Sequence, residues 1–395
     1  MHGSRKLLIG GTLLVLIAGL GVGQAVMGAR ARDAVAEVPI FEVDPFWPKP
    51  LPNHWILGST IGVGVDSRDH VFIIHRRNTF DERTEIGAAA DPPAAECCTP
   101  APNILEFDPD GNLVNSWGGP SDEYTWPSSN HGITIDPADN VWIGGNGQGD
   151  SHILKFTRDG RFLMQIGVPE QGVDSNDTTS FGRVAKIAFT ADGREAFVAD
   201  GYGNHRVAVL DAGTGEFLRY WGAYGHEPSD ERLPRYDPDA PPAQQFRNPV
   251  HCAQPSNDGL VYVCDRVNDR IQVFRADGTF VKEALIAPRT LGDGSVWDIA
   301  FSRDPEQRFI YLADGSNRKV YIIERESLEV LTSFGDGGRQ PGQFYAVHSI
   351  ATDSQGNIYT TETYEGKRVQ KFVYQGMGTV TAKDQGVVWP GGSGG

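Results

Sequence analysis

Clustered positive charge is what this sequence of 395 residues most clearly lacks. Its 35 Lys and Arg residues are outnumbered by 51 Asp and Glu residues, which gives a formal net charge of −16, and no basic run is longer than Arg76-Arg77. A surface that binds nucleic acid needs grouped Lys and Arg side chains to neutralise phosphates. The composition therefore argues against a nucleic-acid partner and predicts an acidic, soluble surface.

Long apolar runs are scarce as well. The one clear run extends from Leu7 to about Val22, after two basic residues and before the small-x-small sequence Ala29-Arg30-Ala31. The run is short for a membrane span, which needs roughly 20 residues. We expect residues 1–31 to be a signal peptide, with an uncleaved N-terminal anchor as the alternative. This prediction places the protein outside the cytoplasm, secreted or periplasmic, with membrane contact only through an uncleaved N-terminal segment. No cysteine follows the run, which excludes lipoprotein processing.

Cysteine is rare, with four residues in the whole chain, and their spacing fits no zinc-finger or haem-attachment pattern. Cys252 and Cys264 flank the turn sequence at 256–259 and would face each other across a hairpin. We predict a disulfide between them, which suits an oxidising compartment. Cys97 and Cys98 are adjacent, and their pairing stays open.

Helical periodicity is missing throughout, and a four-strand pattern recurs instead. Short alternating apolar segments, bounded by Asp-Gly, Asn-Gly and Asp-Pro turns, indicate antiparallel strands. The pattern occurs six times: 61–118 (with an insertion at about 82–102), 131–167, 184–222, 251–283, 297–335 and 348–374. Four strands in each repeat of this length are typical of a propeller blade, and the motif is similar to the NHL repeat. We therefore predict an all-β fold, a six-bladed β-propeller over residues 40–389, with a disordered tail at 390–395.

Three histidines fall at one equivalent position of the repeat. The first inward-facing residues of the six blades are, in order, Ile61, His131, Ala185, His251, Trp297 and His348. Histidine thus occupies every second blade, so that three imidazoles would converge on the central channel about 120° apart. Three neutral imidazoles with an open fourth position are what a catalytic zinc site needs. We predict that His131, His251 and His348 bind zinc, whereas His75 is interpreted as a structural strand residue.

At these positions the chain resembles peptidyl-α-hydroxyglycine α-amidating lyase, the lyase domain of peptidylglycine amidating enzymes. The resemblance covers about residues 55–375 and rests also on three phrases, at 71–76, 199–206 and 264–274. It implies a zinc ion held by the three histidines and a catalytic tyrosine, here Tyr202. It further implies two arginines, Arg76 and Arg266, that bind the substrate carboxylate or steady the tyrosine.

The implied substrate is a carbinolamide, a peptide that ends in α-hydroxyglycine, and the implied products are an amide and glyoxylate. Tyr202 would act as the base that removes the hydroxyl proton. The family also has a structural calcium, bound by an Asp after the third histidine and by main-chain carbonyls that correspond to Val63 and Ile133. Ser349 replaces that Asp here. Because calcium prefers charged oxygen ligands, the replacement argues against calcium in this chain.

Other interpretations stay open at this point. The chain is alternatively a non-catalytic, exported NHL-type binding scaffold, or a calcium-dependent hydrolase of the lactonase type, which gathers carboxylates rather than histidines in its channel. For single residues, Tyr202 is alternatively a turn aromatic, Arg76 the partner of a neighbouring Asp, and Arg266 the partner of Asp265. The expected ligand is a small molecule or the C-terminus of a peptide.

Overall fold

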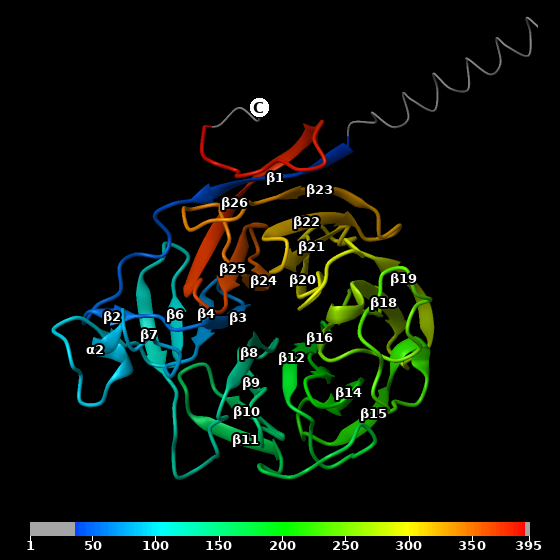
Figure 1. Ribbon diagram of the computed structural model, residues 1–395, viewed down its shortest axis with the longest axis horizontal. Helices are drawn as coiled ribbons and strands as arrows, with labels where there is room; N and C mark the ends of the chain where they lie inside the picture. The colour runs from blue at the N-terminus through cyan, green and yellow to red at the C-terminus, as the bar shows by residue number, and fades with distance from the viewer. Residues whose placement is uncertain (1–35, 392–395) are drawn as a thin grey trace, which may run out of the picture.

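The computed structural model describes residues 36–391 and confirms the predicted all-β, six-bladed propeller. Six four-stranded sheets surround a central axis in chain order, as Figure 1 shows from blue to red. The predicted signal peptide or anchor at 1–31 and the end of the predicted tail, 392–395, lie outside the described residues.

In five of the six sheets the strands are arranged in chain order, with the first strand of each next to the channel. The first sheet contains β3 (Thr60–Val65), β4 (Val71–His75), β6 (Ile104–Phe107) and β7 (Leu113–Trp117), and the second contains β8 (Asn130–Ile135), β9 (Val141–Gly145), β10 (His152–Phe156) and β11 (Phe162–Gly167). The third contains β12 (Val184–Phe189), β13 (Glu195–Asp200), β14 (Arg206–Asp211) and β15 (Phe217–Trp221), and the fourth contains β16 (Val250–Pro255), β17 (Leu260–Asp265), β18 (Arg270–Arg275) and β19 (Phe280–Leu285). The fifth contains β20 (Asp298–Phe301), β21 (Phe309–Asp314), β22 (Lys319–Glu324) and β23 (Val330–Phe334).

The sixth sheet joins the two ends of the described chain. Its inner strands are β24 (Val347–Thr352), β25 (Ile358–Glu362) and β26 (Arg368–Val380), and its outermost strand is β1 (Ala36–Asp44). β1 pairs antiparallel with β26, from Ala36 opposite Val380 to Asp44 opposite Lys371, and Figure 1 shows the two strands side by side at the rim. This pairing closes the ring and covers an otherwise open sheet edge.

Burial follows the position of a strand within its sheet. The middle strands β9, β10 and β17 are buried almost throughout, because both faces of each sheet pack against a neighbouring sheet. The outermost strands β7, β11 and β15 are mostly half-buried. One of the clusters between sheets contains Phe197, Val209, Val263 and Phe274 from the third and fourth sheets. Such packing makes a rigid frame for side chains on the innermost strands.

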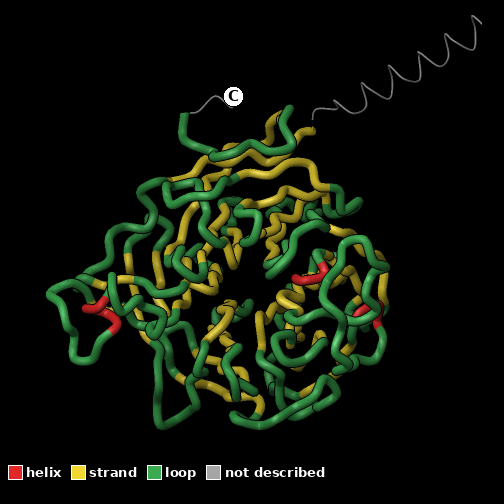
Figure 2. The backbone as a smooth tube through the Cα atoms, in the orientation of Figure 1, coloured by secondary structure: helices red, strands yellow, loops and turns green. Residues whose placement is uncertain are grey.

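Helices are few and short in the described residues. They are α2 (Ile86–Ala89) and the 3₁₀ turns η1 (Ala223–Gly225) and η2 (Arg266–Asn268), drawn in red in Figure 2. Across residues 36–391, no helix has the length and apolarity needed to cross a membrane. α2 belongs to the insertion between β4 and β6, which also holds β5 (Thr99–Pro100), paired in parallel with β2 (Trp55–Ile56).

Both cysteine pairs are joined in the structure. Cys252 on β16 lies opposite Cys264 on β17, and the two form a disulfide, as the sequence predicted. Cys97 and Cys98, whose pairing the sequence left open, are bonded to each other within the insertion. The Cys252–Cys264 disulfide therefore links the two innermost strands of the fourth sheet, next to His251.

Candidate metal centre

His131, His251 and His348 meet in the channel, at the start of the innermost strands β8, β16 and β24. One nitrogen from each ring lies within 4.8 Å of the others, and the ring centroids are 4.8 to 5.2 Å apart. Each ring is at most 4% exposed. The structure thus brings together the three residues that the repeat alignment singled out.

A β-bulge accompanies each of these histidines. The strand register shifts between His131 and Ile133, between Val250 and Cys252, and between Val347 and Ser349. An extra residue at such a point bends the strand and re-aims a side chain. In these three sheets the bulge explains how a histidine at a strand end points along the channel rather than into the sheet interface.

Backbone carbonyls fix the orientation of two of the rings. Nδ1 of His131 donates to the carbonyl oxygen of Ala185 at 2.7 Å, and Nδ1 of His251 donates to that of Trp297. Each acceptor belongs to the next sheet around the ring. Because a carbonyl only accepts, the proton of each neutral ring must lie on Nδ1, which leaves the lone pair of Nε2 directed into the channel. This is the usual arrangement of a histidine that binds a metal.

Gly132 makes room for the contact between His131 and Ala185. Its φ of +69° lies in the left-handed region, and a Cβ added there would come within 2.5 Å of the Ala185 carbonyl oxygen. A side chain at 132 would therefore displace the acceptor that orients His131.

Burial favours the neutral form of all three imidazoles. Burial lowers the pKa of His131 to about 3, with a further lowering by Arg76, and burial likewise holds the pKa values of His251 and His348 well below the usual value. The Nδ1 atom of His348 is buried and has no hydrogen-bond partner. Three neutral imidazoles that converge in a buried site, one of them with an unpaired ring nitrogen, offer the nitrogen lone pairs that a bound cation needs. The residues present therefore fit a metal ion of the zinc type.

Tyr202 lies against the histidines from the turn between β13 and β14. Its hydroxyl oxygen is 3.0 Å from Nε2 of His131 and 3.1 Å from Nε2 of His251. A hydroxyl carries one proton, so it can donate to only one of the two acceptors at a time. The tyrosine is thus a direct contact of the candidate centre and not a remote turn aromatic.

Arg266 is the second side chain that reaches Tyr202. Its Nη1 donates to the Tyr202 hydroxyl at 3.3 Å, and its guanidinium lies 4.6 Å from the centre of the Trp297 ring. Its charge partner is Asp293, at 3.6 Å and half exposed, rather than Asp265. Asp265 pairs with Arg270 at 2.7 Å. A buried guanidinium with one distant, exposed partner retains donors for an anionic ligand.

Arg76 also lies near His131, since it contacts the preceding residue, Asn130. Its Nε donates to the carbonyl of Asn130 at 3.2 Å and its Nη2 to Oδ1 of Asn146 at 2.8 Å. Burial lowers the pKa of Arg76, an effect opposed by neighbouring Tyr202. Its hydrogen bonds go to Asn130 and Asn146 and to no Asp, so the ion pair considered from the sequence is not formed.

His75 stands apart from the candidate centre. Its Nδ1 accepts from the backbone N–H of Gly58 at 3.0 Å, its Nε2 donates to the carbonyl of Pro102 at 2.9 Å, and burial lowers its pKa to about 4. Both ring nitrogens are used, which agrees with the structural role expected from the sequence.

A second group of potential metal-binding side chains among the described residues is Asp66, His70 and Glu106. Here the guanidinium of Arg158 pairs with both carboxylates. It also lies 2.8 Å from Nδ1 of His70. A positive side chain therefore already fills the position that an ion would need.

Two loop residues beside the centre were not predicted. The hydroxyl of Tyr364 donates to Oδ2 of Asp293 at 3.0 Å, so that Tyr364, Asp293 and Arg266 form a chain of contacts that ends at Tyr202. Their loops carry no repeat pattern, and no sequence signal relates 293 to 364.

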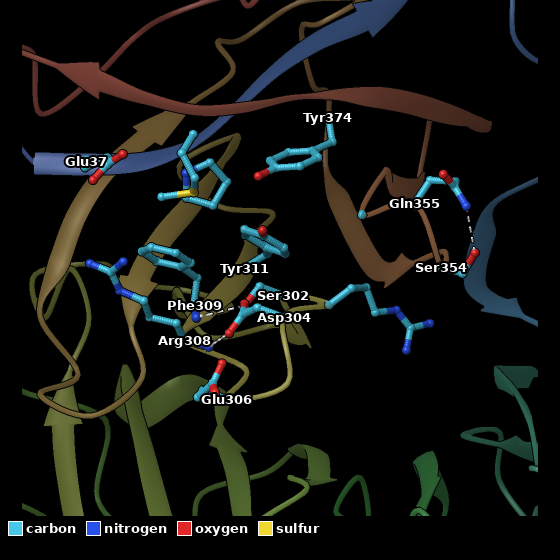
Figure 3. A pocket seen from close by; sticks show the side chains of 14 residues that line it. Glu37, Ser302, Asp304, Glu306, Arg308, Phe309, Tyr311, Ser354, Gln355 and Tyr374 are labelled. Carbon is cyan, nitrogen blue, oxygen red and sulfur yellow. Dashed lines mark hydrogen bonds between the residues drawn. The ribbon is translucent and has the colours of Figure 1, made fainter.

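A cavity of about 410 Å³ also lies at the outer part of the fifth and sixth sheets. Tyr311, Tyr374, Phe309 and Arg308 line it, as Figure 3 shows. No histidine of the candidate centre lines it, so this cavity is separate from the convergent histidines.

Comparison with known proteins supports the resemblance seen in the sequence. The Drosophila melanogaster peptidyl-alpha-hydroxyglycine alpha-amidating lyase 1 is 25% identical over 355 residues, which cover 84% of this chain and 59% of that protein. The rat peptidylglycine alpha-amidating monooxygenase is 28% identical over 79% of this chain and 30% of its own length. The mouse NHL repeat-containing protein 3 is 24% identical over 85% of each chain. This chain is therefore a distant homologue of the amidating-lyase domains and of the NHL repeat protein over most of its length, while it spans only 59% and 30% of the first two relatives.

No protein-family model matches the chain. Among solved structures, a Bacteroides thetaiotaomicron protein of unknown function covers 81% of this chain and 70% of its own, with 12% identity and a TM-score of 0.50. That similarity shows the fold alone. A streptogramin B lyase aligns over 85% of this chain and 98% of its own, with 13% identity and a TM-score of 0.49.

Proposed function

We propose that this protein is a zinc-dependent lyase that cleaves the C–N bond of a peptidyl-α-hydroxyglycine-like carbinolamide to an amide and glyoxylate. The observation that carries the proposal is the position of the Tyr202 hydroxyl, within 3.1 Å of the ring nitrogens of two converging neutral histidines. The distant homology to amidating lyases supports the substrate class.

His131, His251 and His348 would hold the zinc ion through their Nε2 atoms. When bound, zinc polarises substrate oxygens and makes a hydroxyl group more acidic. The carbonyls of Ala185 and Trp297 hold two of the rings with these nitrogens directed inward. The protein thereby prearranges the ligands, which lowers the cost of reorganisation on binding.

Tyr202 would act as the base in the reaction. As phenolate, it accepts the proton of the substrate hydroxyl; the C–O bond becomes a carbonyl while the C–N bond breaks and its electron pair passes to the amide nitrogen. The nitrogen then takes up one proton, which Tyr202 can return. The products are a primary amide and glyoxylate, and no redox partner is needed. Arg266, whose Nη1 donates to the tyrosine oxygen at 3.3 Å, helps to hold that oxygen beside the histidines.

The arginines would recognise the carboxylate of the substrate. Arg266 is buried and has one distant carboxylate partner, Asp293, which is half exposed and can be displaced. Arg76 approaches from the first sheet beside His131. Arginine suits bidentate contact with a carboxylate. The proposed ligand is therefore a peptide C-terminus or a small molecule with the same carboxylate, and we propose no nucleic-acid partner.

An extracytoplasmic location is part of the same proposal. It is supported by the signal-like sequence before residue 32 and by the Cys252–Cys264 disulfide, which suits an oxidising compartment.

A non-catalytic binding scaffold is the second candidate. It is favoured by one comparison, the match to NHL repeat-containing protein 3 over 85% of both chains, since that name states repeats and no activity. A scaffold would use the channel mouth to bind ligands without turning them over.

Metal analysis of the purified chain, beside a His251→Ala variant and a His75→Ala control, tests the proposal. We expect about one zinc per wild-type chain, loss of zinc in His251→Ala and retention in His75→Ala. Glyoxylate release from an α-hydroxyglycine peptide should follow the zinc content. A folded wild-type chain that takes up no zinc would exclude the zinc-dependent lyase. A zinc-loaded chain that binds the peptide without cleaving it would favour the non-catalytic binding scaffold.

A further inference from the structure

An ion pair crosses the channel next to the histidine layer. Nζ of Lys186 on β12 lies 2.6 Å from Oδ1 of Asp298 on β20, and the two side chains are 11% and 2% exposed. The third and fifth sheets are not neighbours, so the pair spans the channel between them. Lys186 directly follows Ala185 and Asp298 directly follows Trp297, the two residues whose carbonyls orient His131 and His251.

The Asp298 carboxylate is fully used by groups of this chain. Its Oδ2 accepts from the Ser349 hydroxyl at 2.7 Å and from the backbone N–H of Ile350 at 3.1 Å. Its Oδ1 accepts from the N–H of Ile299 at 2.9 Å in addition to the ammonium. Three sheets therefore meet at one buried carboxylate, whose negative charge is balanced by Lys186.

These residues do not fit the calcium ion that the family resemblance implies. Calcium takes six to eight oxygen ligands and depends on negatively charged ones. Position 349 offers a hydroxyl that donates its proton to Asp298, and Asp298 is already neutralised by an ammonium. Neither of the two groups of potential metal-binding side chains in residues 36–391 includes Asp298.

We propose that Lys186 is a built-in cation that takes the place of calcium in this channel. The ammonium supplies the positive charge that joins the inner strands of the third, fifth and sixth sheets through Asp298. Lys186 and Asp298 are thus positioning residues for the histidines. Each directly follows, in the chain, a residue whose carbonyl orients one histidine ring. The channel consequently needs no second cation beside the metal that the histidines hold under the proposed function.

The position remains reachable for ions from solvent once the lysine is shortened. A cavity of about 160 Å³ is lined by Lys186 together with Gln254, Arg303 and Thr134. A Lys186→Met/Ser349→Asp variant would remove the ammonium and restore a second carboxylate there. That variant should acquire a calcium site which the wild-type chain lacks.

Thermal unfolding of the full chain in calcium-free, zinc-replete buffer tests this inference. We expect the wild-type melting temperature to change by less than about 1 °C when calcium chloride is added, because an ion that does not bind the folded state cannot stabilise it. Lys186→Met should melt about 5 °C lower, since it leaves a buried carboxylate unpaired. The melting temperature of Lys186→Met/Ser349→Asp should rise when calcium is added and should not rise with magnesium. The melting temperature of Lys186→Arg should stay close to that of the wild type.

The exposed Lys49 gives a matched control, and Lys49→Met should melt like the wild type with or without calcium. One calcium retained per wild-type chain, or a wild-type melting temperature that rises with calcium and not with magnesium, would overturn the inference. The calcium content and melting temperature of the wild-type chain test the inference even if a variant fails to fold. Melting and calcium content are read independently of glyoxylate release, so failure of this inference and failure of the lyase proposal are distinguishable.

Discussion

The hydroxyl oxygen of Tyr202 lies 3.0 Å from Nε2 of His131, although the two residues are 71 positions apart and belong to different sheets. The same hydroxyl lies 3.1 Å from Nε2 of His251, so under the proposed mechanism it is placed where it would take a proton from a bound substrate. A purely structural metal site would surround the ion with ligands and leave no free hydroxyl beside it, so this contact is the feature on which the proposed lyase reaction depends.

Replacement of Tyr202 by Phe should therefore separate chemistry from metal binding. Tyr202→Phe keeps the ring and removes the hydroxyl, so zinc content should stay near that of the wild type while the rate of glyoxylate release falls by about 10²- to 10⁴-fold. Tyr374→Phe, at the separate outer cavity, is the matched control and should keep full activity. An active Tyr202→Phe enzyme would remove the tyrosine from the mechanism.

Arg266 should act chiefly on substrate affinity. Hydrogen bonds to charged groups contribute about 1.5–3 kcal/mol, so Arg266→Met should weaken binding of the substrate carboxylate roughly ten- to hundredfold. Arg266→Lys should recover only part of this affinity, because lysine keeps the charge but loses the guanidinium contact with the Trp297 ring and the bidentate geometry. Steady-state kinetics on an α-hydroxyglycine peptide and on its C-terminal amide would test this. Equal losses on both substrates would show that Arg266 does not bind the carboxylate, and the exposed Arg194→Met is the control.

Much of the centre was predictable because a propeller repeats one strand pattern around an axis. Aligned first strands placed His131, His251 and His348 in alternate sheets, and the structure confirms the fold that this alignment assumed. Cys252 and Cys264 were predictable from the hairpin between them. In each case local periodicity fixes the geometry.

Contacts between residues that come together only when the sheets close into a ring, or that lie in loops, were not predictable from the sequence. Lys186 and Asp298 meet across the axis, 112 residues apart, and neither residue type nor spacing indicates the pair. Asp293 and Tyr364 come from loops, where no strand register applies. The pairing of Cys97 with Cys98 lies in an insertion without repeat pattern. Sequence periodicity specifies which residues face the channel and does not specify which of them pair.

The Cys252–Cys264 disulfide should stabilise both the fold and the centre. It closes a short loop in the innermost hairpin of the fourth sheet, next to His251, and loops of this size contribute about 3 kcal/mol. Cys252→Ala/Cys264→Ala should lower the free energy of unfolding by roughly that amount and weaken zinc retention in a competition with a chelator. Cys97→Ala/Cys98→Ala is the control, since adjacent residues close no loop. Unchanged stability in the first variant would show that strand pairing alone holds the hairpin.

His75 should make stability depend on pH below neutrality. Its pKa is about 4 in the folded protein and 6.5 in the unfolded chain, because burial disfavours the charged ring. Between these values the unfolded state binds a proton that the folded state does not, so stability is complete above pH 6.5 and decreases as the pH falls towards 4. The full effect is roughly 3 kcal/mol. Glutamine can accept from Gly58 and donate to Pro102 as His75 does, so His75→Gln should flatten this part of the profile. Urea unfolding of both proteins in the same metal state at pH 7, 5.5 and 4 would measure the difference, with the exposed His226→Gln as control. A constant difference between wild type and His75→Gln at all three pH values would show that another group controls acid stability.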